Sequence, residues 1–356
     1  MKSKLAALCT YMKGKVAVDT LDEYTYISTE NMIPNKGGIE RASSLPSTQY
    51  TQAFDLGDVL VSNIRPYFKK IWMAEYSGGC SNDVLVFRAS KGCDPTFLYY
   101  VLANNSFFDY ATATSKGTKM PRGDKTAIMQ YEVPAFDIAT QQRIGRLLKG
   151  IDTRIVTNKK INDNLEQQSQ AIYASVFVDN ADPTWQQGHL SDLVNVRYGK
   201  DHKKLADGIY PVYGSGGIMR HVERPLYDKE SVLIPRKGTL NNVVYVNQPF
   251  WSVDTMFYTE MRLPNVAKFV YHFVKAKDLA SMNAGSAVPS MTTDILNAME
   301  VAIPPASVLE EFESLVAPMY RAMQENDVQS KKLADLRDTL LPKLMNGEID
   351  VSGIQL

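Results

Sequence analysis

The chain has 356 residues, more than one hydrophobic core usually accommodates, so we expect two or three domains. Hydrophobic residues make up 44% of the sequence, as in ordinary globular proteins, and no stretch approaches the roughly 20 apolar residues of a membrane span. Lysine plus arginine and aspartate plus glutamate each number 39, which gives a formal net charge of zero. The N-terminal residues are not typical of a signal peptide, and the three cysteines form neither a disulfide framework nor a zinc motif. We therefore expect a cytoplasmic protein without a metal site.

The charge is unevenly distributed along the chain. Residues 306–356 carry a net charge of −4, and residues 1–305 carry a net charge of +4. Binding to nucleic-acid phosphates requires cations. The distribution therefore leaves nucleic-acid binding open for the part of the chain that precedes residue 306.

An internal repeat with an offset near 170 residues organises the sequence. Each copy has a β-branched run that ends in a basic residue, a second apolar run, and a short glycine-containing loop. The paired segments are 57–66 with 229–238, 81–87 with 252–258, and GTKMP (117–121) with GSAVP (285–289). The repeat predicts two related modules, rich in short β-strands.

A long helix follows each module. Apolar positions recur at alternating spacings of four and three from Ile144 to Val176, and again from Phe312 to Leu344, with a constant offset of 168 between the two sets. This heptad pattern is typical of coiled-coil packing. Polar residues interrupt both patterns at the same layer; they are Asn158, Asn162, Asn326 and Ser330.

The fold predicted from these elements is α+β. Two mostly β, mixed domains are joined by two long antiparallel coiled-coil helices, with a pseudo-two-fold internal repeat. The predicted domains are residues 1–135 and 183–305, and the predicted helical spacers are residues 136–180 and 306–350. Apolar patterns also predict one helix at 97–111 and another at 265–282. Ser307 and Glu310 form a capping-box pattern before the second spacer, and Gly347 is a helix-stop signal.

This layout suits a ligand with two separated parts. Each heptad seam covers about 33 residues, or roughly 50 Å of helix. One turn of B-DNA is about 34 Å long. A spacer of this size can place two modules in neighbouring grooves, but the duplication alone does not show that the ligand is DNA.

Several segments resemble type I restriction–modification specificity subunits, and their order does so as well. They are GDVLVSNIRPYFKK (57–70), GKDHKKLADGIYPVYGSGGIM (199–219), ESVLIPRKGTLNNVVYV (230–246), FWSVDTMFY (250–258) and LLPKLMNGEIDV (340–351). The resemblance covers essentially the whole chain. It implies that the two modules are target recognition domains and that the helices are relatively constant spacer regions.

The resemblance also implies the partners. These are double-stranded DNA with an asymmetric two-part site, two methyltransferase subunits that carry S-adenosylmethionine and methylate adenine N6, and restriction subunits that can join to cut DNA. No cofactor is expected in this chain itself. A role in phage defence follows from the same resemblance.

In the first module, the candidate DNA contacts lie in two segments. Gly117 allows a close approach of the backbone to a ligand, and the neighbouring cations suit phosphates or base edges. A structural turn with solvated lysines is the alternative interpretation. The candidates are Asn63, Arg65, Lys69, Lys70, Lys116, Gly117, Lys119 and Arg122.

In the second module, the basic segment at 236–242 corresponds to 63–70, and GSAVP corresponds to GTKMP. YGSGG (213–217) lacks the Lys-Ser/Thr of a P-loop and does not fit the dinucleotide pattern, so we interpret it as a tight turn near the ligand. The candidates are Lys200, Lys203, Tyr213, Ser215, Arg220, Arg236, Lys237, Asn241 and Ser286.

The sequence provides no catalytic motif. A DNA adenine methyltransferase would carry an Asp/Asn-Pro-Pro-Tyr/Phe motif, but Pro304–Pro305 is followed by Ala306. The acidic residues and the four histidines show no metal-ligand spacing. We therefore expect a non-catalytic DNA-recognition subunit. Three alternatives remain open: a coiled-coil adaptor, the specificity chain of a modification-only system, and a self-contained enzyme.

Overall fold

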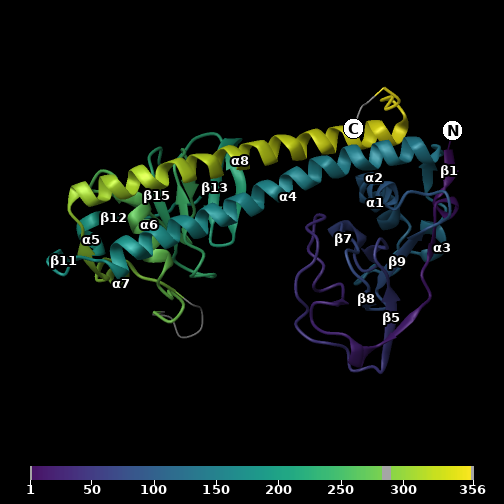
Figure 1. Ribbon diagram of the computed structural model, residues 1–356, viewed down its shortest axis with the longest axis horizontal. Coiled ribbons are helices and arrows are strands. Elements are labelled where there is room, and N and C mark those ends of the chain that lie inside the picture. The colour runs from purple at the N-terminus through teal and green to yellow at the C-terminus, as the bar shows by residue number, and fades with distance from the viewer. Residues whose placement is uncertain (1, 283–289, 354–356) are drawn as a thin grey trace. The chain divides into compact units, whose positions relative to one another are not determined.

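The computed structural model describes residues 2–282 and 290–353 (Figure 1). The predicted contact Ser286, with the rest of GSAVP up to Pro289, lies outside the described residues. The chain divides into two compact units, which we describe separately: unit 1 comprises Met1–Asn158 and Asp327–Leu356, and unit 2 comprises Lys159–Asn326. Each unit contains one predicted globule with part of both long helices, α4 (Ile138–Ala174) and α8 (Ala306–Asn346). Over the described residues, no helix is both long and apolar enough to cross a membrane.

Unit 1 contains two four-stranded sheets and a two-stranded ribbon. The first sheet has the order β2-β9-β6-β7, the second has the order β3-β5-β8-β4, and β1 pairs with β10. The strands are β1 (Lys2–Lys4), β2 (Cys9–Tyr11), β3 (Lys15–Ala17), β4 (Tyr26–Ile27), β5 (Tyr50–Phe54), β6 (Val59–Ser62), β7 (Ile71–Met73), β8 (Gly78–Cys80), β9 (Val84–Ala89) and β10 (Glu132–Pro134). The helices that belong to unit 1 alone are α1 (Pro95–Ala103), α2 (Asn105–Ala113) and α3 (Lys125–Ile128).

The sequence of the central strand β6 lacks the usual alternation of polar and apolar residues. All four of its residues are buried, because both faces of the strand are covered. Val59 and Val61 belong to the core around α1 and α2, whereas Leu60 belongs to a separate core with Phe54 and Trp72. A strand covered on both faces reads as a continuous apolar run, as GDVLVS does.

The prediction of a single helix at 97–111 is wrong, because the chain forms two helices, α1 and α2, in this region. Asn104 has φ −65° and ψ 138°, which is extended rather than helical backbone. Its side chain accepts a hydrogen bond from the N–H of Ser106 and so caps α2. Asp94 caps α1 in the same way through the N–H of Phe97. The asparagine that begins the second helix also ends the first.

Unit 2 repeats this arrangement with changes. The four-stranded sheet has the order β12-β18-β15-β16, β11 pairs with β19, and a three-stranded sheet has the order β14-β13-β17. The strands are β11 (Gln186–His189), β12 (Val194–Tyr198), β13 (Asp207–Gly214), β14 (Gly217–Val222), β15 (Ser231–Pro235), β16 (Val244–Val246), β17 (Trp251–Ser252), β18 (Met256–Met261) and β19 (Glu300–Ile303). The helices are α5 (Leu190–Leu193), α6 (Ala267–Lys275) and α7 (Thr293–Asn297). Helix α6 is therefore shorter than the helix predicted at 265–282.

The duplication is visible in the positions of the elements. Helices α3 and α7 begin at Lys125 and Thr293, strands β10 and β19 at Glu132 and Glu300, and helices α4 and α8 at Ile138 and Ala306. Each of these pairs is separated by the offset of 168 found in the sequence. The antiparallel sheets β2-β9-β6-β7 and β12-β18-β15-β16 also have the same order. The predicted α+β fold with two repeated modules is thus confirmed.

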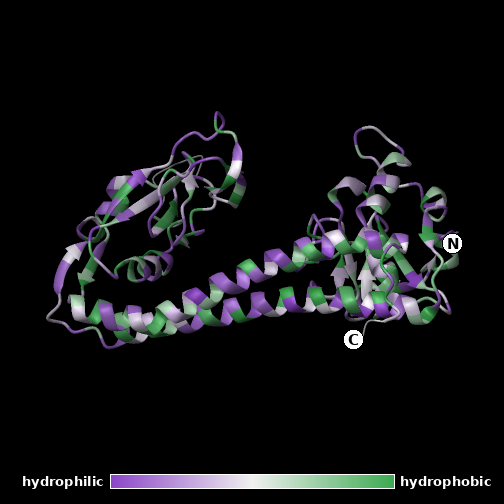
Figure 2. Ribbon diagram, turned by 90° about the horizontal axis from the view of Figure 1, so that it is seen from above, coloured by the Kyte–Doolittle hydropathy of each residue, from purple (hydrophilic) through white to green (hydrophobic). Residues whose placement is uncertain are grey.

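Predicted heptad positions of α4 and α8 contact each other within each unit. Hydrophobic and hydrophilic residues are intermixed along both helices (Figure 2). In unit 1, Asn158 of α4 donates to Gln329 Oε1 at 2.8 Å and to Ser330 Oγ at 3.2 Å. In unit 2, Asn326 of α8 donates to Asn162 Oδ1 at 2.9 Å. In unit 1 the contact on α8 moves back from Arg337 to Ser330 as that on α4 advances from Asp152 to Asn158, and in unit 2 it moves back from Asn326 to Phe312 as that on α4 advances from Asn162 to Tyr173. The helices are therefore antiparallel within each unit. The polar residues of the seam bind one another across the helix pair.

The ends of α8 only partly follow the predicted signals. The helix begins at Ala306, with Pro305 O accepting from the N–H of Val308 at 3.0 Å, so Ser307 lies inside the first turn instead of capping it. At the other end, Gly347 has φ +73°, and the N–H of Glu348 donates to Lys343 O at 3.0 Å. This geometry is a glycine-based helix stop, as predicted.

A polar stripe on α6 joins the globule of unit 2 to the helix pair. Lys268 is buried and binds Glu230 Oε1 at 2.9 Å and Glu313 Oε1, on α8, at 2.7 Å. One turn further on, His272 Nδ1 lies 2.7 Å from Gln170 Oε1, and its Nε2 lies 3.0 Å from the hydroxyl of Tyr320. The contact between α6 and the long helices is therefore hydrogen-bonded as well as apolar.

The burial of His272 predicts a loss of stability in mild acid. Burial lowers its pKa from 6.5 to about 4; the nearby Glu166 opposes this shift and Lys275 supports it. Between these two pH values the unfolded chain binds the proton and the folded chain does not, so stability falls as the pH is lowered from about 6.5 toward 4. We expect a decrease of up to about 3 kcal/mol from this residue.

Urea unfolding between pH 7.5 and pH 5, followed by the fluorescence of the tryptophans, measures this effect. The control is His272→Gln, which keeps a polar side chain without a proton to gain. The variant should lose much of the pH dependence over this range. Equal slopes for the variant and the parent chain would contradict the assignment.

Candidate nucleic-acid interface

In unit 1, the segment that follows β6 lies against the loop that follows α2. The N–H of Arg65 donates to Pro121 O at 2.8 Å, and the N–H of Gly123 donates to Asn63 O at 3.2 Å. Ile64 and Arg122 form a β-bridge between these contacts. The structure thus brings together Asn63, Arg65 and the GTKMPR loop, which are far apart in the sequence.

The GTKMPR loop is closed at its base. The main chains of Lys116 and Arg122 exchange two hydrogen bonds of 2.8 and 2.9 Å. Gly117 has φ +95°, a conformation that favours glycine, and lies next to Met120 O within the loop. Lys119 is exposed beyond this closure. The loop is therefore a small, defined projection that carries cations.

Two of these cations are held by carboxylates of unit 1. The Arg122 guanidinium binds both carboxylate oxygens of Asp83, at 3.0 and 3.2 Å. Lys116 Nζ lies 2.5 Å from Asp124 Oδ2 and holds the pKa of that carboxyl below its usual value. Within residues 2–282 and 290–353, Lys119 has no such carboxylate partner. Lys119 is therefore the loop cation best placed to meet a phosphate.

The segment from residue 65 to residue 70 has an unusual backbone. Arg65 and Lys69 have φ values of +49° and +52° on either side of the 3-10 turn Pro66–Phe68. The Nε atom of Arg65 is buried and has no hydrogen-bond partner among the described groups. Strained, left-handed residues other than glycine concentrate at functional positions. Arg65 therefore combines strain with an unsatisfied donor beside the loop.

The remaining cations of this segment turn back onto unit 1. Lys69 Nζ donates to Asn105 Oδ1 at 3.0 Å, and Lys70 Nζ donates to Thr29 O at 2.6 Å. Burial lowers the pKa of Lys70. The structure places these two predicted contacts in internal hydrogen bonds, and any role of theirs in DNA binding stays a prediction.

Unit 2 repeats the same main-chain arrangement. The N–H of Met291 donates to Arg236 O at 2.9 Å, and Lys237 forms a β-bridge with Ser290. Gly238, with φ +86°, occupies the position that the left-handed Arg65 has in unit 1. Arg236 therefore corresponds to Asn63. The sequence pairing of 57–66 with 229–238 places Pro235 at this position, one residue earlier. The cations of the two segments stand at different positions in the two units.

The turn between β13 and β14 contacts this segment. Gly214 pairs with Gly217, which leaves Ser215 and Gly216 as the turn. Asn242 Nδ2 donates to Ser215 O at 2.8 Å. A Cβ atom on Gly238 would lie 2.7 Å from Ser215 Oγ. The predicted tight turn at YGSGG is present and is fixed against the segment after β15.

The other predicted residues of unit 2 differ in exposure. Tyr213 is buried, with its ring 6.2 Å from that of Phe250, so its side chain is part of the core. Arg220 donates to Asp207 Oδ1 at 2.6 Å and to a main-chain oxygen. Lys200 and Lys203 are exposed on the loop that follows β12. These two lysines are available to phosphate, whereas the position of Tyr213 favours a structural role.

Arg236 and Asn241 are also held by neighbouring groups. Arg236 donates to Asp254 O at 3.1 Å, and its guanidinium lies 5.4 Å from the centre of the Tyr198 ring. Asn241 donates to Asp278 Oδ1 at 3.1 Å. Sequence patterns did not identify these partners, because the carboxylates of Asp83 and Asp278 and the main-chain oxygen of Asp254 come from distant parts of the sequence.

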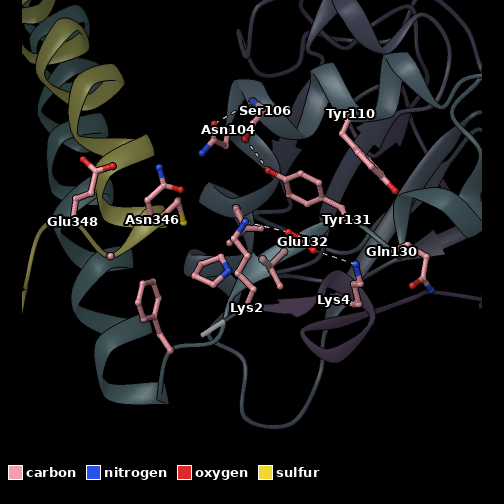
Figure 3. A pocket seen from close by; sticks show the side chains of 16 residues that line it. Lys2, Lys4, Asn104, Ser106, Tyr110, Gln130, Tyr131, Glu132, Asn346 and Glu348 are labelled. Atoms are coloured by element: carbon pink, nitrogen blue, oxygen red, sulfur yellow. Dashed lines mark hydrogen bonds and ion pairs between the residues drawn. The ribbon is translucent and has the colours of Figure 1, made fainter.

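A cavity of unit 1 is lined by none of the predicted contact residues (Figure 3). This 1190 Å³ cavity is lined by β1, β10, α1, α2 and the end of α8. Lys2 and Lys4 both bind Glu132, at 3.1 and 3.6 Å, and Ser106 and Tyr131 share a hydrogen bond of 2.7 Å. The two lining lysines thus share one carboxylate, and Glu348 also lines the cavity.

Neither reactive thiols nor metal-ligand clusters are found in the described residues. Cys9, Cys80 and Cys93 are buried, and burial raises the pKa of each thiol to about 12. A thiol with this pKa is a poor nucleophile at neutral pH. No group of three or more His, Cys, Asp or Glu side chains in residues 2–282 and 290–353 could hold a metal ion.

Comparison with known proteins adds independent findings. The family model described as "Type I restriction modification DNA specificity domain" matches residues 4–167 and again residues 183–311. The chain is 23% identical over 302 residues to the type I restriction enzyme MjaIX specificity subunit of Methanocaldococcus jannaschii, which covers 72% of this chain and 70% of that protein. It is 22% identical over 445 residues to the type I restriction enzyme HindI specificity subunit of Haemophilus influenzae, covering 91% of this chain and 94% of that protein.

A solved structure shows the same fold. The S subunit of a type I restriction–modification system from M. genitalium aligns with 97% of this chain and 96% of its own, with a TM-score of 0.64 and 18% sequence identity. The two matches of the family model fall on the two copies of the internal repeat. The duplication described above is therefore also a duplication of the family's domain.

The contact between Gly238 and the β13–β14 turn can be tested by adding one methyl group. Gly238→Ala places a Cβ against Ser215 at a residue with positive φ, so both strain and overpacking oppose it. We expect the free energy of unfolding to fall by about 1–3 kcal/mol in urea titration. Gly57→Ala is the matched control, because Gly57 has a φ of +87° and a Cβ there would have no heavy atom within 4 Å, so it adds the strain without the contact. Equal stability of the two variants would show that the turn is not fixed in this way.

Proposed function

This chain belongs to the type I restriction–modification DNA specificity family, and from that premise we propose that its two units each recognise one half of a two-part DNA site. The observation that carries the proposal is a main-chain pairing between two loops that occurs once in each unit, which we call the duplicated ladder. Arg236, Lys237 and Ser290 in unit 2 repeat the arrangement of Asn63, Ile64 and Arg122 in unit 1. Each unit thus holds two loops together at the end of its central strand. Loops fixed on a rigid sheet are a common site of recognition.

The difference between the two segments supports an asymmetric site. Unit 1 carries Asn63 and Arg65, where unit 2 carries Arg236 and Gly238. Asparagine suits adenine and arginine suits guanine in the major groove. We therefore infer that the two half-sites differ in sequence. Phosphate contacts by Lys119, Lys200 and Lys203 would position the units without selecting bases.

The chemistry belongs to partner subunits in this proposal. Two methyltransferase subunits bring S-adenosylmethionine and methylate adenine N6 at the half-sites, and restriction subunits join to cut unmodified DNA. Helices α4 and α8 continue from one unit into the other, so their length sets the gap between the half-sites. The assembly works in the cytoplasm, where it meets incoming phage DNA.

Genome-wide mapping of N6-methyladenine tests the proposal. The chain is expressed with the methyltransferase encoded beside it in a host that lacks adenine methylation of its own. We expect one motif with a few defined bases on each side of a fixed gap. Replacing residues 183–305 with the corresponding part of a relative should change one half of the motif and leave the other half and the gap unchanged.

Two results would contradict it. Methylation at a continuous palindrome, or the same methylation without this chain, would remove the recognition role and favour a non-catalytic adaptor. A catalytically inactive methyltransferase is the control for background methylation. The mapped motif then supplies the DNA for the binding experiments below.

The salt dependence of DNA binding tests the cation on the loop of unit 1. Lys119→Ala should weaken binding of the complex with the methyltransferase and should lower the slope of log K against log salt by about 1, as expected for one lost phosphate contact. Lys91→Ala is the matched control, because this exposed lysine lies beyond the opposite end of β9 from Asp83. A slope that Lys119→Ala leaves unchanged would exclude the contact.

A further inference from the structure

The hairpin formed by β13 and β14 exposes two neighbouring apolar side chains. The exposed fractions of Ile218 and Met219 are 54% and 60%. Val212 pairs with Arg220 and Tyr213 pairs with Ile218, so Met219 is an extra residue in a β-bulge. A bulge changes the direction in which a strand presents its side chains, and bulges are frequent beside functional sites. Here both residues are exposed, although they are adjacent on one strand.

This exposed pair is held in place and does not lie on a loose loop. A Cβ atom on Gly214 would lie 2.6 Å from Met219 Sδ, so the methionine side chain lies directly against that glycine. Gly217, with φ +111°, directly follows the turn, and Asn242 anchors the turn through Ser215 O. The chain thus fixes Ile218 and Met219 at the end of unit 2 that carries the duplicated ladder.

Two exposed lysines lie on segments next to the hairpin. Lys200 donates its N–H to Ser252 O at 2.8 Å, and Ser252 pairs with Tyr213 on β13. Lys237 is exposed on the segment that the turn contacts. Cations around an apolar pair suit a ligand that is anionic at its edges and apolar at a defined point. Duplex DNA has this character in the major groove, where thymine presents a C5 methyl group.

We propose that Ile218 and Met219 recognise thymine in the half-site bound by unit 2, by packing against its C5 methyl group in the major groove. This inference rests on the proposed DNA-recognition function and adds the base and the chemical group. A two-stranded ribbon fits the width of the major groove, and the β13–β14 hairpin is such a ribbon. Apolar side chains distinguish thymine because the other bases lack this methyl group.

The test removes only the methyl group. A duplex that carries the mapped motif is prepared with deoxyuridine in place of each thymidine of the half-site assigned to unit 2. Binding by the complete complex with the methyltransferase is measured by fluorescence anisotropy. We expect the substitution at the contacted position to weaken binding about fourfold, as for one buried methyl group.

A double variant of the protein is then tested on the same two duplexes, so that the changes in the protein and in the DNA can be compared. Ile218→Ala combined with Met219→Ala should bind the thymidine duplex more weakly, and it should no longer distinguish thymidine from deoxyuridine at that position. Ile209→Ala is the matched control. Ile209 is 79% exposed on the same hairpin, but it lies near Val222, at the end away from the turn. This control should keep the full preference for thymidine.

The outcomes separate this inference from the function on which it rests. Specific binding of the motif with equal affinity for the thymidine and deoxyuridine duplexes would overturn the thymine contact and leave the proposed function standing. A half-site without any A·T pair would overturn it too. Loss of methyltransferase assembly in the double variant, with no change in thymidine preference, would make the pair a protein contact. Failure to bind the motif at all would overturn the proposed function itself.

Discussion

The constraint on which the rest of the structure depends is the burial of the central strands β6 and β15 on both faces. Neither strand can use side-chain alternation to meet solvent, so the polar groups of each unit's recognition end collect where the strand stops. There the main chain still needs partners, and a distant segment supplies them: Pro121 and Gly123 in unit 1, and Ser290 and Met291 in unit 2. The ladder that satisfies these groups also brings together the loops that carry the candidate contacts.

Much of the charge at this end is used to hold the loops in shape. Arg122, Lys116 and Arg220 each bind a carboxylate of their own unit. Exposed ion pairs of this kind contribute little stability, and each one leaves less net positive charge for phosphate. The formal net charge of the chain is zero, so binding to DNA phosphates depends on where the remaining cations lie. Exposed lysines such as Lys119, Lys200 and Lys203 remain to attract the phosphate backbone.

The sequence predicted the repeated and periodic features well, because duplication and heptad spacing can be recognised from the order of residue types alone. It could not predict features that depend on contacts between distant residues. Asn104 ends one helix because it caps another, and Ser307 lies inside α8 because the helix begins at Ala306. Tyr213 appeared as a contact beside a glycine-rich turn, yet strand β13 directs its ring into the core. The exposure of Ile218 and Met219 was not predicted, because one extra residue in a strand leaves no mark in its composition.

Corresponding positions in the two units have acquired different chemistry, and this limits how freely the recognition modules can be exchanged. When α1 is aligned with α6 by their first residues, Tyr100 corresponds to His272. Tyr100 donates to Asp152 at 2.7 Å in a group that includes Arg337, whereas His272 contacts Gln170 and Tyr320. Lys268 adds a buried charge that depends on Glu313 of α8. Removing one partner of a buried ion pair costs far more than removing both. A replacement for residues 183–305 must therefore keep a cation opposite Glu313, because α8 stays behind when the module is exchanged.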